Sequence, residues 1–278
     1  MIPTPNFLSR LIPGPSRSRS ISIKRPDWSP DLRHFQANTR RPLPVRLSLV
    51  PGEAAGLFAI PARRLQALLR ALAVLQKGET GEGRIAYEID RASFAGIDDT
   101  YRSALKLFVA EEGRHARLLA ILFTGLGGRL LRSSASSRLF TWARRLAGVR
   151  LKLLVLATAE IAGIVLYARF ARILPAGVCR SWLREIVRDE AFHLRFHARC
   201  FHGWLSSRNA PAPVTGALAR GVFLILWRLG VTAAYVSLVL FLRKELRDLA
   251  ISRTRVWRAF WFWSERLERI VRESKLQA

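Results

Sequence analysis

Two copies of the sequence Glu-x-x-His constrain this chain of 278 residues more than any other feature. The first runs from Glu112 to His115 and the second from Glu190 to His193. On an α-helix, residues three positions apart share one face, so each motif presents a carboxylate and an imidazole to the same side. Two such helices, joined by two more that each add one Glu, would form a site for two metal ions. The four motif residues are therefore predicted metal ligands.

Glu160 is the strongest candidate for a third carboxylate. It is the only acidic residue between Glu112 and Glu185, and residues 153–166 around it are otherwise almost entirely apolar. Burying an unpaired carboxylate costs several kcal/mol, so a buried Glu160 needs a cation. An ion pair with an arginine of another helix is the alternative. We favour metal ligation because the second Glu-x-x-His follows Glu160 on the next predicted helix.

The first half of the chain offers the same arrangement. The interval from Glu79 to Glu112 is only slightly longer than the interval from Glu160 to Glu190. The chain therefore reads as two copies of a helix pair, each with a Glu followed by a Glu-x-x-His. Glu82 precedes Glu112 by the same interval as in the second half, and it could replace Glu79 or assist it. We favour Glu79.

The apolar pattern predicts an all-α protein built on a four-helix bundle, with additional C-terminal helices. Residues 1–52 are rich in Pro, Ser and Arg and are predicted to be a basic, disordered arm. The bundle is assigned to residues 53–208 and the C-terminal helices to 209–278. The expected helices are an amphipathic one over 61–78, a first bundle helix opening at 79–88, and three further bundle helices over 98–123, 139–173 and 179–204.

Three short stretches resemble motifs of a known superfamily. Residues 78–85 read Gly-Glu-Thr-Gly-Glu-Gly-Arg-Ile, which resembles the opening motif of demethoxyubiquinone hydroxylases and, more loosely, that of rubrerythrins. Residues 157–160 and 189–193 are similar to the later motifs of the hydroxylases. The resemblance covers about residues 76–204 and implies a ferritin-like di-iron carboxylate bundle. It implies one set of ligands, which are also the candidate catalytic residues: Glu79, Glu112, His115, Glu160, Glu190 and His193.

Four further residues are candidates for supporting roles. Glu111 and Asp189 each precede a motif Glu, and we expect each to hold the Nδ–H of the opposite helix's histidine, the alternative being a surface charge. Tyr167, two turns after Glu160, either lines a pocket or belongs to the core. His197, one turn after His193, is either an extra nitrogen ligand, as in some arylamine N-oxygenases of this superfamily, or a pocket histidine.

Composition limits the partners and the compartment. The chain carries 46 Lys and Arg against 20 Asp and Glu, a net charge of +26, which predicts attraction to an anionic membrane surface or to nucleic acid. Cys179 and Cys200 form no metal-binding pair, which excludes a zinc ribbon or a rubredoxin-type iron site. We expect an intracellular protein, cytoplasmic or peripheral to the inner face of a membrane. The Arg/Ser-rich start resembles an organellar transit segment, and a lead-in that binds an anionic surface fits equally well.

The C-terminal region suggests contact with lipid. Residues 221–242 form an apolar run interrupted only by Arg228, which opposes insertion across a bilayer. We expect a fifth helix that packs on the bundle or lies in the membrane interface, the alternative being a helix that spans the membrane. Residues 255–263 mix Trp and Phe with Arg, which suits a membrane interface or a helix docked on the bundle.

The leading functional hypothesis is a di-iron oxygenase or hydroxylase. It would use O2 and an electron donor to oxidise a lipophilic or aromatic small molecule, and it could be a homodimer. Carboxylates with imidazoles suit two iron ions, with manganese as the alternative. The competing hypotheses are a ferritin-like or rubrerythrin-like protein that handles iron or peroxide, and a tRNA-acting hydroxylase.

Overall fold

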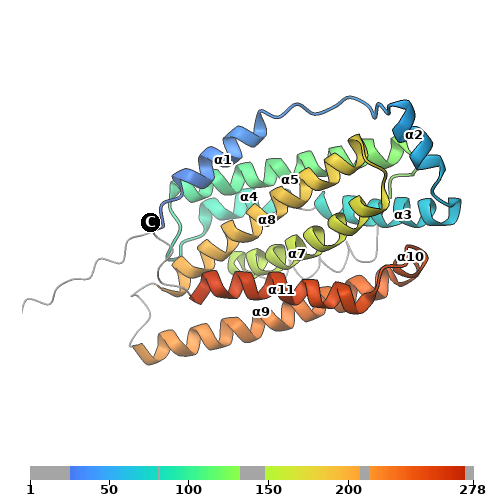
Figure 1. Ribbon diagram of the computed structural model, residues 1–278. Coiled ribbons are helices and arrows are strands. Elements are labelled where there is room, and N and C mark those ends of the chain that lie inside the picture. The colour runs from blue at the N-terminus through green and yellow to red at the C-terminus, as the bar shows by residue number, and fades with distance from the viewer. Residues whose placement is uncertain (1–25, 81, 132–147, 207–212, 273–278) are drawn as a thin grey trace, which may run out of the picture.

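The regular secondary structure in the described part of the protein is all helical. The computed structural model describes residues 26–80, 82–131, 148–206 and 213–272. These residues form ten α-helices and two short 3-10 helices, and none of them lies in a strand (Figure 1). The prediction of an all-α protein is therefore confirmed.

Four long helices run side by side through the centre of the molecule. They are α3 (Ala62–Glu79), α5 (Asp99–Gly125), α7 (Val149–Ile173) and α8 (Val178–Leu205). Helix α3 packs along α5, and α7 packs along α8. Asp98 caps α5 as its sequence position predicts, since its carboxylate accepts a hydrogen bond of 2.8 Å from the Tyr101 amide.

A tight connection joins α7 to α8 and makes them antiparallel. Gly177 lies in this connection at a φ of +149°, and a Cβ there would collide with the Glu53 carboxylate. Glu53 belongs to α2 (Pro51–Phe58) and is buried, and its Oε1 accepts a hydrogen bond of 3.0 Å from the Cys179 amide. A carboxylate from outside the bundle therefore satisfies the N-terminus of α8.

The first bundle helix differs from the sequence prediction. A helix ending near residue 78 and a second one opening at 79 were expected, whereas α3 continues through Gly78 and ends at Glu79. A single glycine in a helix costs only about 1 kcal/mol, which is too little to break one that is buried along one side. Three short helices follow: η1 (Glu82–Arg84), α4 (Ile85–Glu88) and η2 (Ile89–Arg91).

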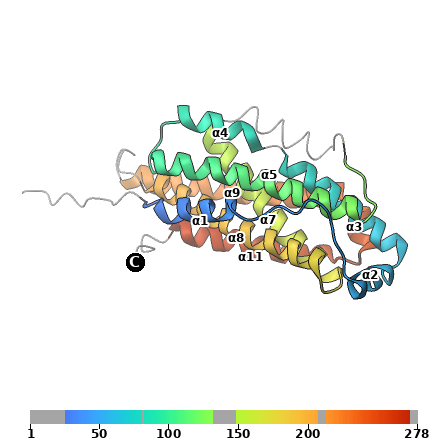
Figure 2. The same cartoon turned by 90° about the horizontal axis from the view of Figure 1, so that it is seen from above.

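The predicted disordered arm is wrong for residues 29–39, while residues 1–25 lie outside the described part of the chain. Residues in this region form α1 (Ser29–Thr39), which lies along α5 (Figures 1 and 2). Trp28 and Phe35, two helical turns apart, are both buried. Two aromatic anchors therefore dock a helix whose other positions are mostly polar. Of the predicted third bundle helix, residues 149–173 are confirmed as α7, while 139–147 lie outside the described residues.

The C-terminal region forms α9 (Pro213–Phe241), α10 (Arg243–Asp248) and α11 (Arg253–Arg272). Helix α9 packs against both α7 and α11. Among the described residues, two helices are long and apolar enough to cross a membrane by length and composition, namely α7 and α9. In the most apolar window of α7, 72% is buried inside the molecule, against 28% for α9, so only α9 leaves a large apolar face uncovered.

Arg228, the one charge in the apolar run, has a defined partner. Its guanidinium donates to both carboxylate oxygens of Glu268 on α11, at 3.0 and 2.8 Å. The neighbouring Trp227 is buried and donates a hydrogen bond of 2.8 Å to Ser264 Oγ, also on α11. Arg228, whose charge opposes membrane insertion, therefore binds α9 to α11.

Replacing Arg228 with methionine is expected to lower the free energy of unfolding by about 1–2 kcal/mol, because buried Glu268 would lose its bidentate partner and keep only Arg272. Urea unfolding measures the change. The additional substitution Glu268→Gln should restore part of the loss, and Arg220→Met, at an exposed position of the same helix, is the matched control. Equal stability of Arg228→Met and the control would contradict the prediction.

Candidate metal centre

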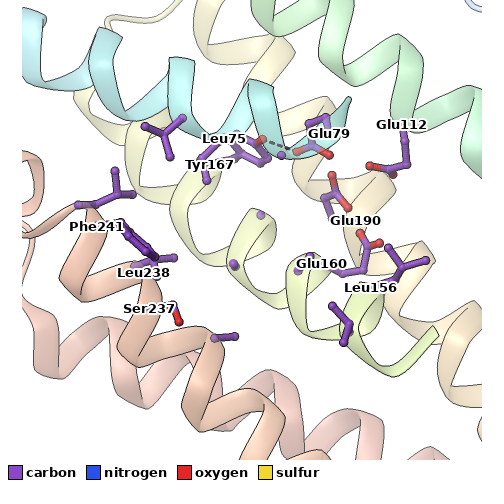
Figure 3. A pocket seen from close by; sticks show the side chains of 18 residues that line it. Leu75, Glu79, Glu112, Leu156, Glu160, Tyr167, Glu190, Ser237, Leu238 and Phe241 are labelled. Carbon is purple, nitrogen blue, oxygen red and sulfur yellow. Dashed lines mark hydrogen bonds between the residues drawn. The ribbon is translucent and has the colours of Figure 1, made fainter. Parts of the chain in front are cut away.

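The predicted ligands come together between the four central helices. Helix α3 supplies Glu79 from its last position, α5 supplies Glu112 and His115, α7 supplies Glu160, and α8 supplies Glu190 and His193. Figure 3 shows the four glutamates converging from these helices. Glu79 is half-buried, and the other five side chains are buried.

The tightest group contains three carboxylates and one imidazole. Ligand atoms of Glu112, Glu160, Glu190 and His193 all lie within 4.8 Å of one another. His193 Nδ1 is 2.9 Å from a Glu112 oxygen, 3.3 Å from a Glu190 oxygen and 3.5 Å from a Glu160 oxygen. His115 Nδ1 approaches Glu190 at 3.3 Å and Glu112 at 3.7 Å. Glu112 and Glu190 thus contact both histidines.

The outer nitrogens of the two histidines are held by the helices opposite. His115 Nε2 lies 3.1 Å from Asp189 Oδ2, and His193 Nε2 lies 3.2 Å from Glu111 Oε2. The predicted cross-helix pairing is present, but the atom is Nε2 and not Nδ, because Nδ1 of each ring faces the glutamates. When Nε2–H donates to a carboxylate, the Nδ1 lone pair is left pointing into the cluster, as metal ligation requires.

Residues of the N-terminal segment support these carboxylates from outside. Asn38 Nδ2 donates a hydrogen bond of 2.6 Å to Glu111 Oε1, and Arg41 binds both oxygens of Asp189 at 2.8 and 2.9 Å. Burial raises the pKa of Asp189, but hydrogen bonds from His115 and Arg41 outweigh it and lower the pKa to about 2. The sequence analysis missed Asn38 and Arg41; the spacing of Trp28 and Phe35 was the only signal that this segment packs on the bundle.

Burial and like charges perturb the protonation of the inner glutamates. Burial first, and then the negative charges of Glu190 and Glu112, raise the pKa of both Glu160 and Glu79 well above the usual value. Burial opposes protonation of His115, but the hydrogen bond to Asp189 and the nearby carboxylates of Glu190 and Glu112 outweigh it and raise the pKa to about 10. Without a cation, the cluster must therefore take up protons to limit repulsion between its carboxylates.

The donor atoms fit a metal ion. Buried Glu112 Oε1 and His115 Nδ1 have no hydrogen-bond partner among the described residues, and they face each other in the cluster. Unpaired buried polar atoms are costly, and carboxylates with neutral imidazoles are the ligands that iron, manganese and zinc accept. These buried Glu and His groups could therefore hold a metal ion.

Three further predicted residues occupy different positions. His197 is completely buried, neither of its nitrogens has a hydrogen-bond partner among the described residues, and its Nε2 lies 3.9 Å from Glu160 Oε1. Burial and the charge of His193 lower its pKa to about 3, so it stays a neutral imidazole. Tyr167 donates a hydrogen bond to Glu79, which Figure 3 marks. The side chain of Glu82 lies outside the part of the chain that is described.

An apolar cavity borders the glutamates. It has a volume of about 110 Å³ and extends from the four carboxylates, between α3 and α7, to Ser237, Leu238 and Phe241 on α9 (Figure 3). Gly163 lies on its wall, where a Cβ would come within 3.3 Å of the Tyr167 ring and 3.4 Å of the Glu190 side chain. A larger residue at 163 would press into the cavity and against both neighbours.

The site therefore combines two kinds of surface. One side presents buried acids and imidazoles that could hold metal, and the other side is almost wholly apolar and reaches α9. Small-molecule sites in proteins usually have this composition, an apolar pocket with a few polar groups. Comparisons of the chain with family models, with curated proteins and with solved structures gave no match.

Proposed function

We propose that this protein is a ferritin-like di-iron oxidoreductase of the monooxygenase type, which oxidises a lipophilic small molecule with O2. The observation that carries the proposal is the buried Glu/His cluster beside an apolar cavity. Glu79 and His115 would hold one ion, Glu160 and His193 the other, and Glu112 and Glu190 would be shared. Two iron ions held there as Fe(II) would supply the two electrons needed to reduce O2 or peroxide.

The protein's own residues have separate tasks in this reaction. Asp189 and Glu111 keep the Nε2 protons of His115 and His193 in place, so that both Nδ1 atoms remain available as ligands. Arg41 balances the charge of Asp189, and Tyr167 orients Glu79 through its hydroxyl. The apolar walls exclude bulk water from the cluster and favour a substrate without charges.

The surface of α9 supports a membrane as the source of that substrate. Its exposed apolar residues recur at helical spacing along one face: Leu218, Val222, Ile225, Leu226, Leu229, Val236 and Leu240. Arg243, Lys244 and Arg247 are exposed just beyond its C-terminal end, directly after Phe241 and Leu242, which line the cavity. We therefore place α9 in the interface of an anionic membrane, lying along the surface.

Metal content is the first experiment. Protein purified without oxygen and loaded with Fe(II) should contain about two irons per chain by elemental analysis, and an oxo-bridge band should appear in the near ultraviolet after exposure to oxygen. Protein that cannot be loaded would refute the proposal. Uptake of many irons per chain would instead favour iron storage, and catalytic loss of peroxide without an organic substrate would favour the rubrerythrin-like alternative.

Membrane binding gives an independent prediction. The protein should co-sediment with vesicles that contain anionic lipid. The triple substitution R243E/K244E/R247E should weaken this binding by roughly 3 kcal/mol or more. Each lost basic residue costs about 1 kcal/mol of binding free energy, and each new acidic residue adds repulsion. Neutral vesicles are the control for the apolar contribution of α9. Retention of tRNA in a gel at physiological salt, without vesicle binding, would favour the tRNA-acting alternative.

A further inference from the structure

A second hollow lies on the side of the molecule formed by α1, α8 and α11, which are neighbours in Figure 2. It is a groove with a volume of about 380 Å³, and we call it the arginine groove. Its floor contains Phe192, Trp263 and Ile270, and three exposed arginines line it: Arg188, Arg195 and Arg266. Arg195 lies 5.0 Å from the centre of the Phe192 ring, and Arg266 lies 5.2 Å from that of Trp263.

The composition of the arginine groove is that of a protein-binding surface. Trp and Arg are the residues that most often carry binding energy at interfaces, particularly when an apolar centre is surrounded by charge. The three arginines determine the sign of the partner, which must be acidic. In Figure 1 α1 lies at the top of the molecule and α9 at the bottom, so contact of α9 with a membrane leaves α1 accessible.

A continuous chain of contacts leads from this groove to the candidate metal centre. His34 lines the groove and stacks on Phe192, with ring centres 3.6 Å apart. Asn38 Nδ2 lies 3.1 Å from His34 Nε2 and donates to Glu111, whose other oxygen accepts from His193 Nε2 at 3.2 Å. The opposite nitrogen of His193 faces the inner glutamates.

A second connection consists of aromatic rings. Phe35 packs edge-on against Phe192 at 5.3 Å between ring centres, and it lies 5.8 Å from the His193 ring. The groove is therefore joined to one predicted ligand by hydrogen bonds and by ring contacts. Both connections pass through α1, which lies outside the region of motif resemblance.

We propose that the arginine groove is the docking site of a small acidic iron–sulfur protein, and that electrons enter the metal centre through His34, Asn38, Glu111 and His193. This inference rests on the proposed function, because a di-iron oxygenase must be reduced between turnovers. Each docked donor is oxidised by one electron, so two successive dockings reduce two Fe(III) ions to two Fe(II) ions. No covalent bond forms or breaks in the connecting residues.

Binding tests the docking site directly. The probe is a plant-type [2Fe–2S] ferredoxin, titrated against the isolated protein at low and at physiological salt. The wild type should bind in a salt-sensitive manner, and R188E/R195E/R266E should weaken binding by roughly tenfold or more at low salt. The matched control R243E/K244E/R247E reverses three exposed charges in α10, and it should change the affinity by less than about threefold.

Three outcomes would overturn the docking site. The first is that the wild type does not bind ferredoxin. The second is that both triple variants lose ferredoxin affinity equally. The third is that R188E/R195E/R266E loses binding to anionic vesicles while R243E/K244E/R247E keeps it. Equal losses would mean that the ferredoxin responds only to overall charge. Loss of vesicle binding in the groove variant only would mean that the groove binds lipid. Circular dichroism and the milder variant R188Q/R195Q/R266Q verify that the fold is retained.

The substitution His34→Phe tests the electron path. It keeps a ring stacked on Phe192 but removes the nitrogen that meets Asn38. In iron-loaded protein, reduction by ferredoxin should slow several-fold, while ferredoxin affinity and reduction by dithionite stay unchanged. An unchanged rate with ferredoxin would overturn the path. If the protein takes up no iron, the proposed function fails, whereas the affinity titration still decides the docking site.

Discussion

Replacing Glu160 with glutamine is expected to abolish metal binding and to leave the metal-free protein as stable as the wild type, within about 1 kcal/mol. Burial and the negative charge of Glu190 raise the pKa of Glu160, so the metal-free protein holds this acid protonated, and glutamine resembles it in shape and charge. At a metal concentration 100 times the Kd, the free energy of unfolding of the wild type should rise by about 2.7 kcal/mol for each bound ion, and that of the variant should not rise. Elemental analysis and thermal unfolding with and without Fe(II) measure both effects.

Two further variants make this result specific. His193→Ala should also lose the metal while its helical content is kept, because the imidazole is one of the innermost groups of the cluster. Glu265→Gln, at an exposed position of α11, should bind as much iron as the wild type. Unchanged iron content in both Glu160→Gln and His193→Ala would show that the metal centre is assigned to the wrong residues.

Replacing Trp28 with alanine is expected to lower the free energy of unfolding by about 3–5 kcal/mol, the usual cost of removing a large aromatic from a core. Trp28 is 1% exposed, packs 4.8 Å from Tyr101 and 5.5 Å from Phe196, and donates a hydrogen bond of 3.0 Å to the Gly96 carbonyl. Urea denaturation measures the change.

Phe58→Ala is the control for this prediction. Phe58 is 88% exposed, so the substitution should change stability by no more than about 0.5 kcal/mol. If Trp28→Ala lowers the free energy of unfolding by less than about 1 kcal/mol, the segment before α1 is not part of the core. That result would agree with the disorder that the composition of residues 1–52 predicts.

The arrangement of the candidate ligands was largely predictable because it is local. Helical periodicity alone places Glu112 beside His115 and Glu190 beside His193, and the isolation of Glu160 in an apolar stretch marks it as a buried acid. The position of Glu79 was also predicted, although the helix that carries it was assigned the wrong boundary. Asp98 indicated the start of α5 by its capping chemistry.

The supporting residues were not predictable, because their contacts span long distances in the chain. Asn38 meets Glu111 across 73 positions, and Arg41 meets Asp189 across 148. No local sequence pattern encodes such pairs. The segment is polar and Pro-rich, a composition typical of disorder, and only the burial of its two aromatic residues against the bundle shows that it is folded. The pairing of Arg228 with Glu268 on α11 was not predictable for the same reason, because the two residues lie 40 positions apart.

The sequence by itself determined the helical class, the pairing of each Glu with its His, and the apolar helix that carries Glu160, because these follow from the period of one helix and the cost of burying one charge. Only the tertiary structure decided that α1 covers the candidate metal centre, that each histidine turns Nδ1 inward, and that a cavity joins the glutamates to α9. Those features arise where separate helices meet, and their relative placement depends on how all the side chains pack together.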